Sequence, residues 1–203
     1  MIKNRISRKT IMMKIQAWKL AKLMHKNQKY PGTNLPYEYH LSQVYNIINH
    51  TFTESDPLDK EHMILCAILH DIIEDTPITG DDIRKDFSNE IALSVMALTK
   101  SKELFKYEAL EDSLKRICEC PLPKETLAVK LADRIANLSN MPPKIWRKNK
   151  VENYILESKM IYDTAVRFYT TPIKPILTLM SSLDENINNW VNYLQRMNKN
   201  DIG

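Results

Sequence analysis

Residues 64–76 read ILCAILHDIIEDT, an apolar run that changes abruptly into a histidine and three acids. Charged groups are almost never buried without a partner, so this segment needs something that offsets its charges, and a metal ion is the first candidate. In one continuous helix, His70 and Glu74 would lie one turn apart on the same face, as would Asp71 and Asp75. An ordinary half-buried helix with a core histidine and a solvated acidic end is the alternative.

Two other segments place polar residues in apolar surroundings. They are 36-PYEYHLSQV-44, which contains His40, and 129-VKLADRIANL-138, which contains Asp133. The order of His40, His70-Asp71 and Asp133 resembles that of the HD-domain metal-dependent phosphohydrolases. Within that group, 69-LHDIIEDT-76 and 130-KLADRIANL-138 are similar to the hydrolase domain of the RelA/SpoT alarmone enzymes of the stringent response, and to small stand-alone alarmone hydrolases.

The resemblance extends from about Leu20 to about Ala165 and carries several expectations. It implies that one divalent metal is bound by His40, His70, Asp71 and Asp133. It also implies an all-α HD-domain helical bundle. The implied reaction is the release of pyrophosphate from the 3′ position of (p)ppGpp.

The composition favours helices over sheets. A chain of 203 residues is usually one domain, and only three glycines accompany ten methionines. We therefore expect a single HD-type hydrolase domain over residues 1–203, with a core at about 10–170 and a C-terminal accessory helix at about 173–197. A net charge of +4 suits an anionic small molecule as well as nucleic acid. No concentrated basic stripe is interleaved with aromatic residues, which argues against a nucleic-acid partner.

The three cysteines favour a reducing, cytoplasmic compartment. Cys66, Cys118 and Cys120 are odd in number and lack the spacing of a zinc site, and Cys66 falls in the apolar run. The basic stretch from Met1 to Lys14 lacks the apolar core and cleavage site of a secretory signal. No apolar run approaches the ~20 residues that span a bilayer, so no membrane partner is expected.

Apolar periodicity predicts the remaining helices. They are expected from about Thr10 to Gln28, from His40 to the break at 53–57, from Asp59 to Glu74, from a cap at Thr79, over 91–98, from Lys124 through Asp133, over 151–169 and over 175–197. The structure of the charged stretch 101–111 is left open. His25 is expected to be structural rather than a ligand, and His50 and His62 are expected at the surface.

The expected ligand set defines the chemistry. Two imidazoles and two carboxylates suit Mn²⁺, Fe²⁺, Co²⁺ or Zn²⁺, and manganese is preferred partly through the family resemblance. Glu74 and Asp75 lie one turn beyond His70 and Asp71, where they could handle a second water or a leaving-group proton as catalytic residues. Acids are disfavoured at a helix C-terminus, which strengthens the functional interpretation over a structural one.

Substrate-binding residues are expected on both sides of the metal. Lys130 and Asn137 can share a helix face with Asp133. The resemblance further implies that Thr99, Lys100 and Asn137 lie near the nucleotide, with Tyr154 against its sugar. Lys29, Lys100, Lys130 and Lys148 are expected to carry the phosphates, and the ring of Tyr30 to stack on the base.

The chain departs from the alarmone hydrolases in one loop. The family pattern Gln-x-Arg-Lys-x-Gly is replaced by 28-QKYPG-32, which lacks the arginine, and Leu41 follows His40 where proline is usual. The metal chemistry is unaffected, whereas base recognition is altered. The alternatives are therefore an HD-domain hydrolase of another nucleotide phosphate, and a non-catalytic helical binding protein.

Overall fold

The computed structural model describes residues 8–200, apart from the side chains of 198–200, and the residues before Arg8 in the basic N-terminal stretch lie outside it. The predicted all-α fold is confirmed: the described part contains no strand, only an isolated bridge between Lys29 and Pro36. The helices are α1 (Arg8–Met24), α2 (Glu38–Thr51), α3 (Lys60–Leu69), α4 (Ile72–Asp75), α5 (Gly80–Asp86), α6 (Asn89–Leu98), α7 (Lys106–Glu119), α8 (Pro123–Leu138), α9 (Lys148–Phe168) and α10 (Lys174–Asn200).

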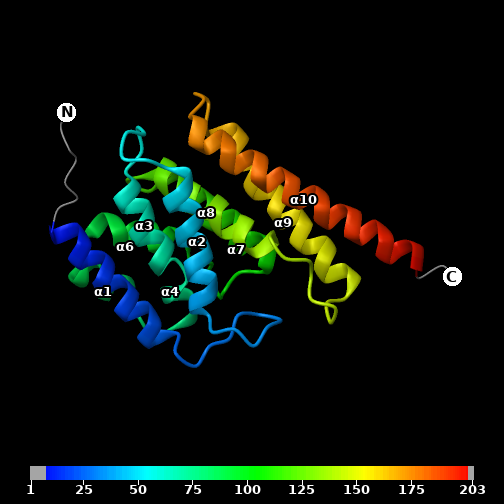
Figure 1. Cartoon of the computed structure of the whole chain (residues 1–203), viewed down its shortest axis with the longest axis horizontal. Coiled ribbons are helices and arrows are strands. Elements are labelled where there is room, and N and C mark those ends of the chain that lie inside the picture. The colour runs from blue at the N-terminus through cyan, green and yellow to red at the C-terminus, as the bar shows by residue number, and fades with distance from the viewer. Residues whose placement is uncertain (1–7, 201–203) are drawn as a thin grey trace.

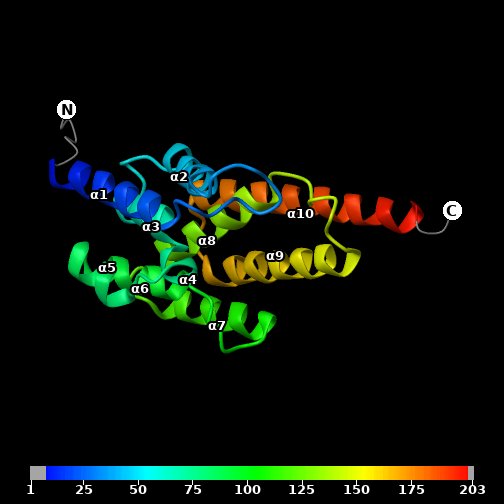
Figure 2. The same ribbon diagram turned by 90° about the horizontal axis from the view of Figure 1, so that it is seen from below.

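The helix α8 occupies the centre of the fold. It packs against α2, α3, α6, α7, α9 and α10, and nearly all of its residues are buried. Pro123 stands in its first turn, where the missing N–H of proline removes no intrahelical hydrogen bond. Figures 1 and 2 show α9 and α10 side by side along the long axis of the molecule, with α1 at the opposite end.

The segment predicted as one helix over 59–74 is divided in two, which is a correction. α3 ends at Leu69 and α4 begins at Ile72. Nδ1 of His70 lies 2.9 Å from the carbonyl oxygen of Ala67, the oxygen that the amide of Asp71 would bond in a continuous helix. The His70 imidazole therefore occupies the carbonyl that the Asp71 amide would otherwise bond, and the helix is interrupted at His70 and Asp71.

Other boundaries agree with their sequence signals. Thr79 caps α5 through a capping box with Asp82, as its position before two acids predicted. The open stretch 101–111 contains the start of α7 at Lys106. None of the helices that the structure describes is both long enough and apolar enough to cross a membrane.

His62 is buried, and its expected surface position was wrong. Its side chain lies on the inner face of α3, where Nε2 is 3.0 Å from the Ser94 hydroxyl and 3.4 Å from Sγ of Cys66. His50, in contrast, is exposed as expected. Burial lowers the pKa of His62 below its ordinary value of 6.5, and the Asp59 and Glu125 carboxylates only partly oppose this effect.

We expect the free energy of unfolding to fall at acidic pH because of His62. The unfolded chain takes up a proton near pH 6.5, whereas the folded chain takes it up only at lower pH. The stability is therefore complete above pH 6.5 and decreases as the pH falls toward the folded pKa, by at most ~1.4 kcal/mol per pH unit. Urea unfolding of the wild type and of His62→Gln between pH 7.5 and 5 measures this difference.

The glutamine variant should show the shallower pH dependence, because it keeps a polar group near Ser94 but has no imidazole to titrate. His50→Gln is the matched control and should keep the wild-type dependence. Equal slopes for His62→Gln and the wild type would contradict the expectation.

Candidate metal centre and active site

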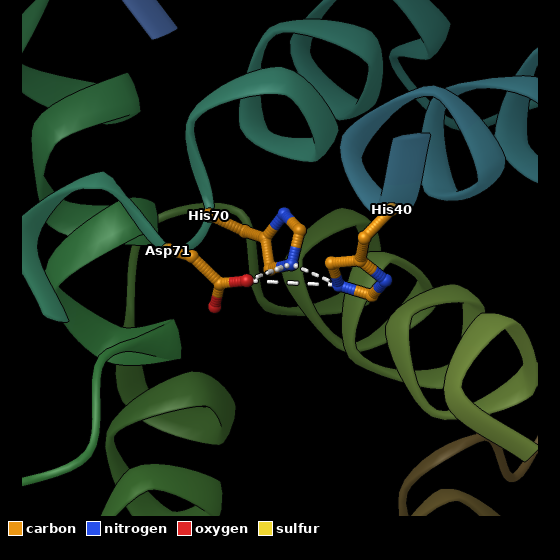
Figure 3. A group of neighbouring side chains, drawn as sticks. All are labelled: His40, His70 and Asp71. Carbon is orange, nitrogen blue, oxygen red and sulfur yellow. Dashed lines mark hydrogen bonds and ion pairs between the residues drawn. The ribbon is translucent and has the colours of Figure 1, made fainter. Parts of the chain in front are cut away.

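The His-Asp motif meets His40 at one buried point. His40 stands in the first turn of α2, and His70 and Asp71 stand between α3 and α4 (Figure 3). The two Nε2 atoms of His40 and His70 lie 3.2 Å apart. Oδ2 of Asp71 lies 2.8 Å from Nε2 of His70 and 3.6 Å from Nε2 of His40. These three side chains form a group whose donor atoms could hold one metal ion.

Asp133 approaches the same point from α8. Its Oδ1 lies 3.3 Å from Nε2 of His40 and 3.7 Å from Nε2 of His70. The four residues predicted to be ligands are thus brought together from three separate segments of the chain, and both imidazoles are almost fully buried.

The donor set fits a divalent ion. The Ala67 carbonyl can only accept a hydrogen bond, so Nδ1 of His70 carries a proton in either state of the ring, and Nε2 is the nitrogen directed at the cluster. Burial alone would lower the pKa of His70, but the Asp71 and Asp133 carboxylates outweigh it and raise the pKa to about 9. A charge that attracts a proton this strongly also attracts a metal cation, which would displace the proton.

Tyr37 holds Asp71 from outside the cluster. Its hydroxyl donates a 2.5 Å hydrogen bond to Oδ2 of Asp71, and its ring stacks on His25 at a centroid distance of 4.9 Å. Burial, together with the Asp71 charge, raises the pKa of Tyr37 far above its usual value, so the phenol stays a donor. The sequence reasoning missed Tyr37, and its only signal was a position three residues before His40.

Glu74 and Asp75 are each held by one specific hydrogen bond. Oε2 of Glu74 accepts a 3.0 Å hydrogen bond from the Lys100 amide, and burial raises the Glu74 pKa. Oδ2 of Asp75 accepts a 2.8 Å hydrogen bond from the Gln28 side chain. The other end of that amide lies 2.6 Å from Nδ1 of His25, so the structural role expected of His25 extends to the site.

Cations gather beside the carboxylates of the cluster. Nζ of Lys130 lies 3.2 Å from Oδ2 of Asp133, and Asn137 donates a 2.6 Å hydrogen bond to Oδ1 of Asp133. Burial raises the pKa of Asp133, but Lys130 and the two imidazoles outweigh this effect and hold the pKa well below its usual range. Burial lowers the pKa of Lys100, and the charges of Lys130 and Arg134 lower it further.

A cavity of about 460 Å³ adjoins the cluster. Two of its lining residues reach the metal ligands, since Asn137 bonds Asp133 and the ring of Tyr30 lies parallel to His40 at 5.4 Å. The aromatic, amide and basic residues that line the cavity include Tyr30, Lys106, Asn137, Trp146, Lys150, Tyr154 and Trp190. Tyr154 was expected near the nucleotide, whereas Lys106, Trp146 and Trp190 were not singled out from the sequence.

The loop before α2 closes one side of this cavity. Gly32 adopts a φ of +78°, and a Cβ atom there would stand 2.6 Å from Cγ of Pro143. Glycine therefore permits both the turn and the close approach of the two loops. The ring of Tyr30 is only 7% exposed and stacks on His40. Little of the ring is therefore free for the expected stacking on a base.

The remaining predicted residues have separate positions. The hydroxyl of Thr99 donates to the Val95 carbonyl and thereby caps the end of α6. Lys29 is exposed and does not line the cavity. Lys148 pairs with Glu152 at 3.9 Å, and Lys150 lines the cavity in its place, with Nζ 4.0 Å from the Trp146 ring centroid.

A helical bundle that gathers a histidine, a His-Asp pair and a distant aspartate defines a metal-dependent hydrolase of the HD class. The family model for the HD domain matches residues 17–164, and the chain belongs to this family. The resemblance found in the sequence motifs is thereby confirmed.

Several relatives are named for one reaction. The chain is 28% identical over 135 residues to the Drosophila melanogaster guanosine-3′,5′-bis(diphosphate) 3′-pyrophosphohydrolase MESH1, covering 63% of this chain and 70% of that one. It is 31% identical over 134 residues to MESH1 of Danio rerio, covering 64% and 71%. The enzyme of the same catalytic name from Aquifex aeolicus is 30% identical over 149 residues, which cover 72% of this chain but 20% of that protein.

One solved structure shares the fold. It is described as a metazoan ortholog of SpoT that hydrolyses ppGpp, and it superposes with a TM-score of 0.69 at 24% identity over 87% of this chain and 94% of the other. At this identity the likeness supports the arrangement of helices alone.

Proposed function

We propose that this protein is a manganese-dependent hydrolase that releases pyrophosphate from the 3′ position of (p)ppGpp. The observation that carries the proposal is the cluster of four metal-type ligands, which Tyr30 and Asn137 join to a cavity with aromatic walls. Curated relatives of comparable length are named for this reaction. The whole chain would act as one cytoplasmic HD-type unit, with a core over about 10–170 and an accessory C-terminal helix.

The metal site would consist of His40, His70, Asp71 and Asp133. A divalent ion bound there would acidify a water molecule and neutralise charge on the attacked phosphate. Tyr37 keeps Asp71 oriented by its hydrogen bond, and the Ala67 carbonyl keeps Nε2 of His70 directed inward.

The buried cations would receive the pyrophosphate. Burial and the charges of Lys130 and Arg134 lower the pKa of Lys100, and the repulsion among these cations would be relieved when a polyanion binds. Arg134 is itself fixed by Glu157, at 3.3 Å, and by the ring of Tyr154, at 4.3 Å from the ring centroid. This anchoring leaves the two lysines as the more adaptable phosphate contacts.

Glu74 would move the proton. Burial raises its pKa above the ordinary value of 4.5, a direction that suits a group that must both take and release a proton. The Lys100 amide holds its carboxylate in place. Asp75 is fixed by Gln28 and would orient a second water or the leaving group.

The nucleoside would occupy the cavity. Its walls offer the rings of Trp146 and Tyr154 and the amide of Asn137, with no carboxylate among the lining residues. Without the family's arginine, discrimination between purines depends on these neutral groups, so recognition should rest more on the pyrophosphate than on the base.

Replacing Asp133 tests the metal site. The wild type should bind about one manganese ion per chain, and Asp133→Ala should retain little, because one ligand is lost. Elemental analysis after dialysis against manganese measures the content. Asp133→Asn keeps the shape of the side chain and shows whether a loss of metal is due to misfolding. Asp184→Ala, at an exposed position of α10, is the control. A wild type that takes up no manganese would overturn the metal site.

Glu74→Gln separates catalysis from binding. Glutamine can still accept the Lys100 amide hydrogen bond, so folding and manganese binding should persist. Turnover should fall by at least ~10²-fold, the usual loss when acid–base help is removed. Glu90→Gln, on the exposed first turn of α6, is the matched control. Full activity of Glu74→Gln would assign Glu74 a structural role.

The substrate is tested by parallel assays of pyrophosphate release. We expect manganese-dependent release from ppGpp, slower but measurable release from its adenosine counterpart, and none from nucleotides without a 3′-phosphate. Activity confined to the last group would favour an HD-domain hydrolase of another nucleotide phosphate. Inactivity on all three with manganese bound would remove the alarmone assignment.

A further inference from the structure

Trp190 reaches the cavity from outside the matched HD domain. It stands on α10, beyond residues 17–164, and it is 1% exposed. Most of the inner face of α10 consists of aliphatic residues such as Leu183 and Ile187, which only pack against the core. Trp190 differs from them because its ring lines the cavity beside the metal-ligand cluster.

The indole N–H of Trp190 caps the end of α8. It lies 3.0 Å from the carbonyl oxygen of Leu138 and 3.1 Å from that of Asn140. Leu138 is the last residue of α8, so its carbonyl has no amide partner within the helix. A single donor from α10 therefore fixes the point where α8 ends and the loop toward α9 begins.

The capped turn carries a residue of the site. Asn137 immediately precedes Leu138, donates a 2.6 Å hydrogen bond to Asp133 and lines the cavity. Any loosening of the turn would displace the Asn137 amide before it disturbed Asp133, which Lys130 also holds.

The ring of Trp190 fixes the aromatic wall. It stacks with Tyr154 at a centroid distance of 5.3 Å and an interplanar angle of 28°, and meets Trp146 edge-on at 6.0 Å. The same residue therefore contacts two aromatic residues of the wall, Trp146 and Tyr154, and the 137–140 turn. Simple attachment of α10 to the core would require neither the two carbonyl contacts nor the ring contacts.

We propose that Trp190 is a positioning residue for nucleotide binding, which fixes the 137–140 turn and the Trp146–Tyr154 wall. The inference rests on the proposed function insofar as the ligand is a nucleotide. It assigns α10, which lies outside the matched domain, a share in substrate recognition.

Trp190→Phe tests this role because it keeps an aromatic ring beside Tyr154, while it removes the N–H donor together with part of the ring volume. We expect KM for ppGpp to rise about five- to tenfold, with kcat within about twofold of the wild type and manganese content unchanged. Ile187→Val is the matched control, because Ile187 is buried on the same face of α10 but does not line the cavity. It should lower the thermal stability and leave KM unchanged.

Backbone hydrogen exchange of residues 137–140 gives a second measure that needs no activity. Exchange should accelerate in Trp190→Phe and stay unchanged in Ile187→Val. An unchanged KM in an active Trp190→Phe, or unchanged exchange in the turn, would overturn the proposal. A wild type inactive on ppGpp would instead refute the proposed function, and accelerated exchange would still support the positioning of the turn by Trp190.

Discussion

The imidazoles of His40 and His70 approach each other within 3.2 Å in a region where neither is more than 3% exposed. Two imidazolium ions could not share such a place, and the buried Asp133 and half-buried Asp71 carboxylates beside them need a positive partner. The surrounding structure meets this constraint in part with hydrogen bonds that fix both carboxylates and the His70 ring. The Tyr37 hydroxyl donates a hydrogen bond to Asp71, and the Lys130 ammonium pairs with Asp133. The arrangement is stable as a scaffold for a cation because its charges are oriented before the cation arrives.

The central helix α8 carries both the core and the chemistry. Its apolar residues pack on several neighbouring helices, while Lys130, Asp133 and Arg134 are buried among them. Removing these charges from water is costly, so such groups contribute little net stability even when well paired. Arg134 is matched by Glu157, which Lys106 also contacts at 2.5 Å. The helix thus gives up some stability in order to hold Lys130 and Asp133 at the cluster.

Sequence patterns predicted the helices because apolar periodicity is a local signal. They predicted the metal-type ligands because polar residues are chemically unusual in apolar segments. The periodicity of α2, α8 and α10 could be read directly, and a histidine or aspartate in an apolar run is conspicuous. The break at His70 could not be predicted, because it depends on a side chain competing for the Ala67 carbonyl. The buried position of His62 depends on Ser94, which lies on another helix.

The residues that support the site, such as Gln28 and Trp190, could not be predicted either, because their contacts join distant parts of the chain. Gln28 and Asp75 lie 47 positions apart, and Trp190 lies 52 positions from Leu138. Glutamine and tryptophan are also ordinary residues of helices and loops, so composition does not distinguish them. Their roles follow only from the way the loop after α1 meets α4, and from the way α10 meets the end of α8.

This arrangement separates the metal-type ligands from most of the wall of the adjoining cavity. The metal-type ligands lie within the matched residues 17–164, on α2, α8 and the turn after α3. The cavity wall also draws on α10 and on loops that meet at Gly32 and Pro143. Changes in these outer elements can alter the nucleotide that fits without moving His40, His70, Asp71 or Asp133. Because the cavity wall and the ligand cluster lie on different elements, the 28–32 loop can diverge from the alarmone-hydrolase pattern while the ligand cluster stays intact.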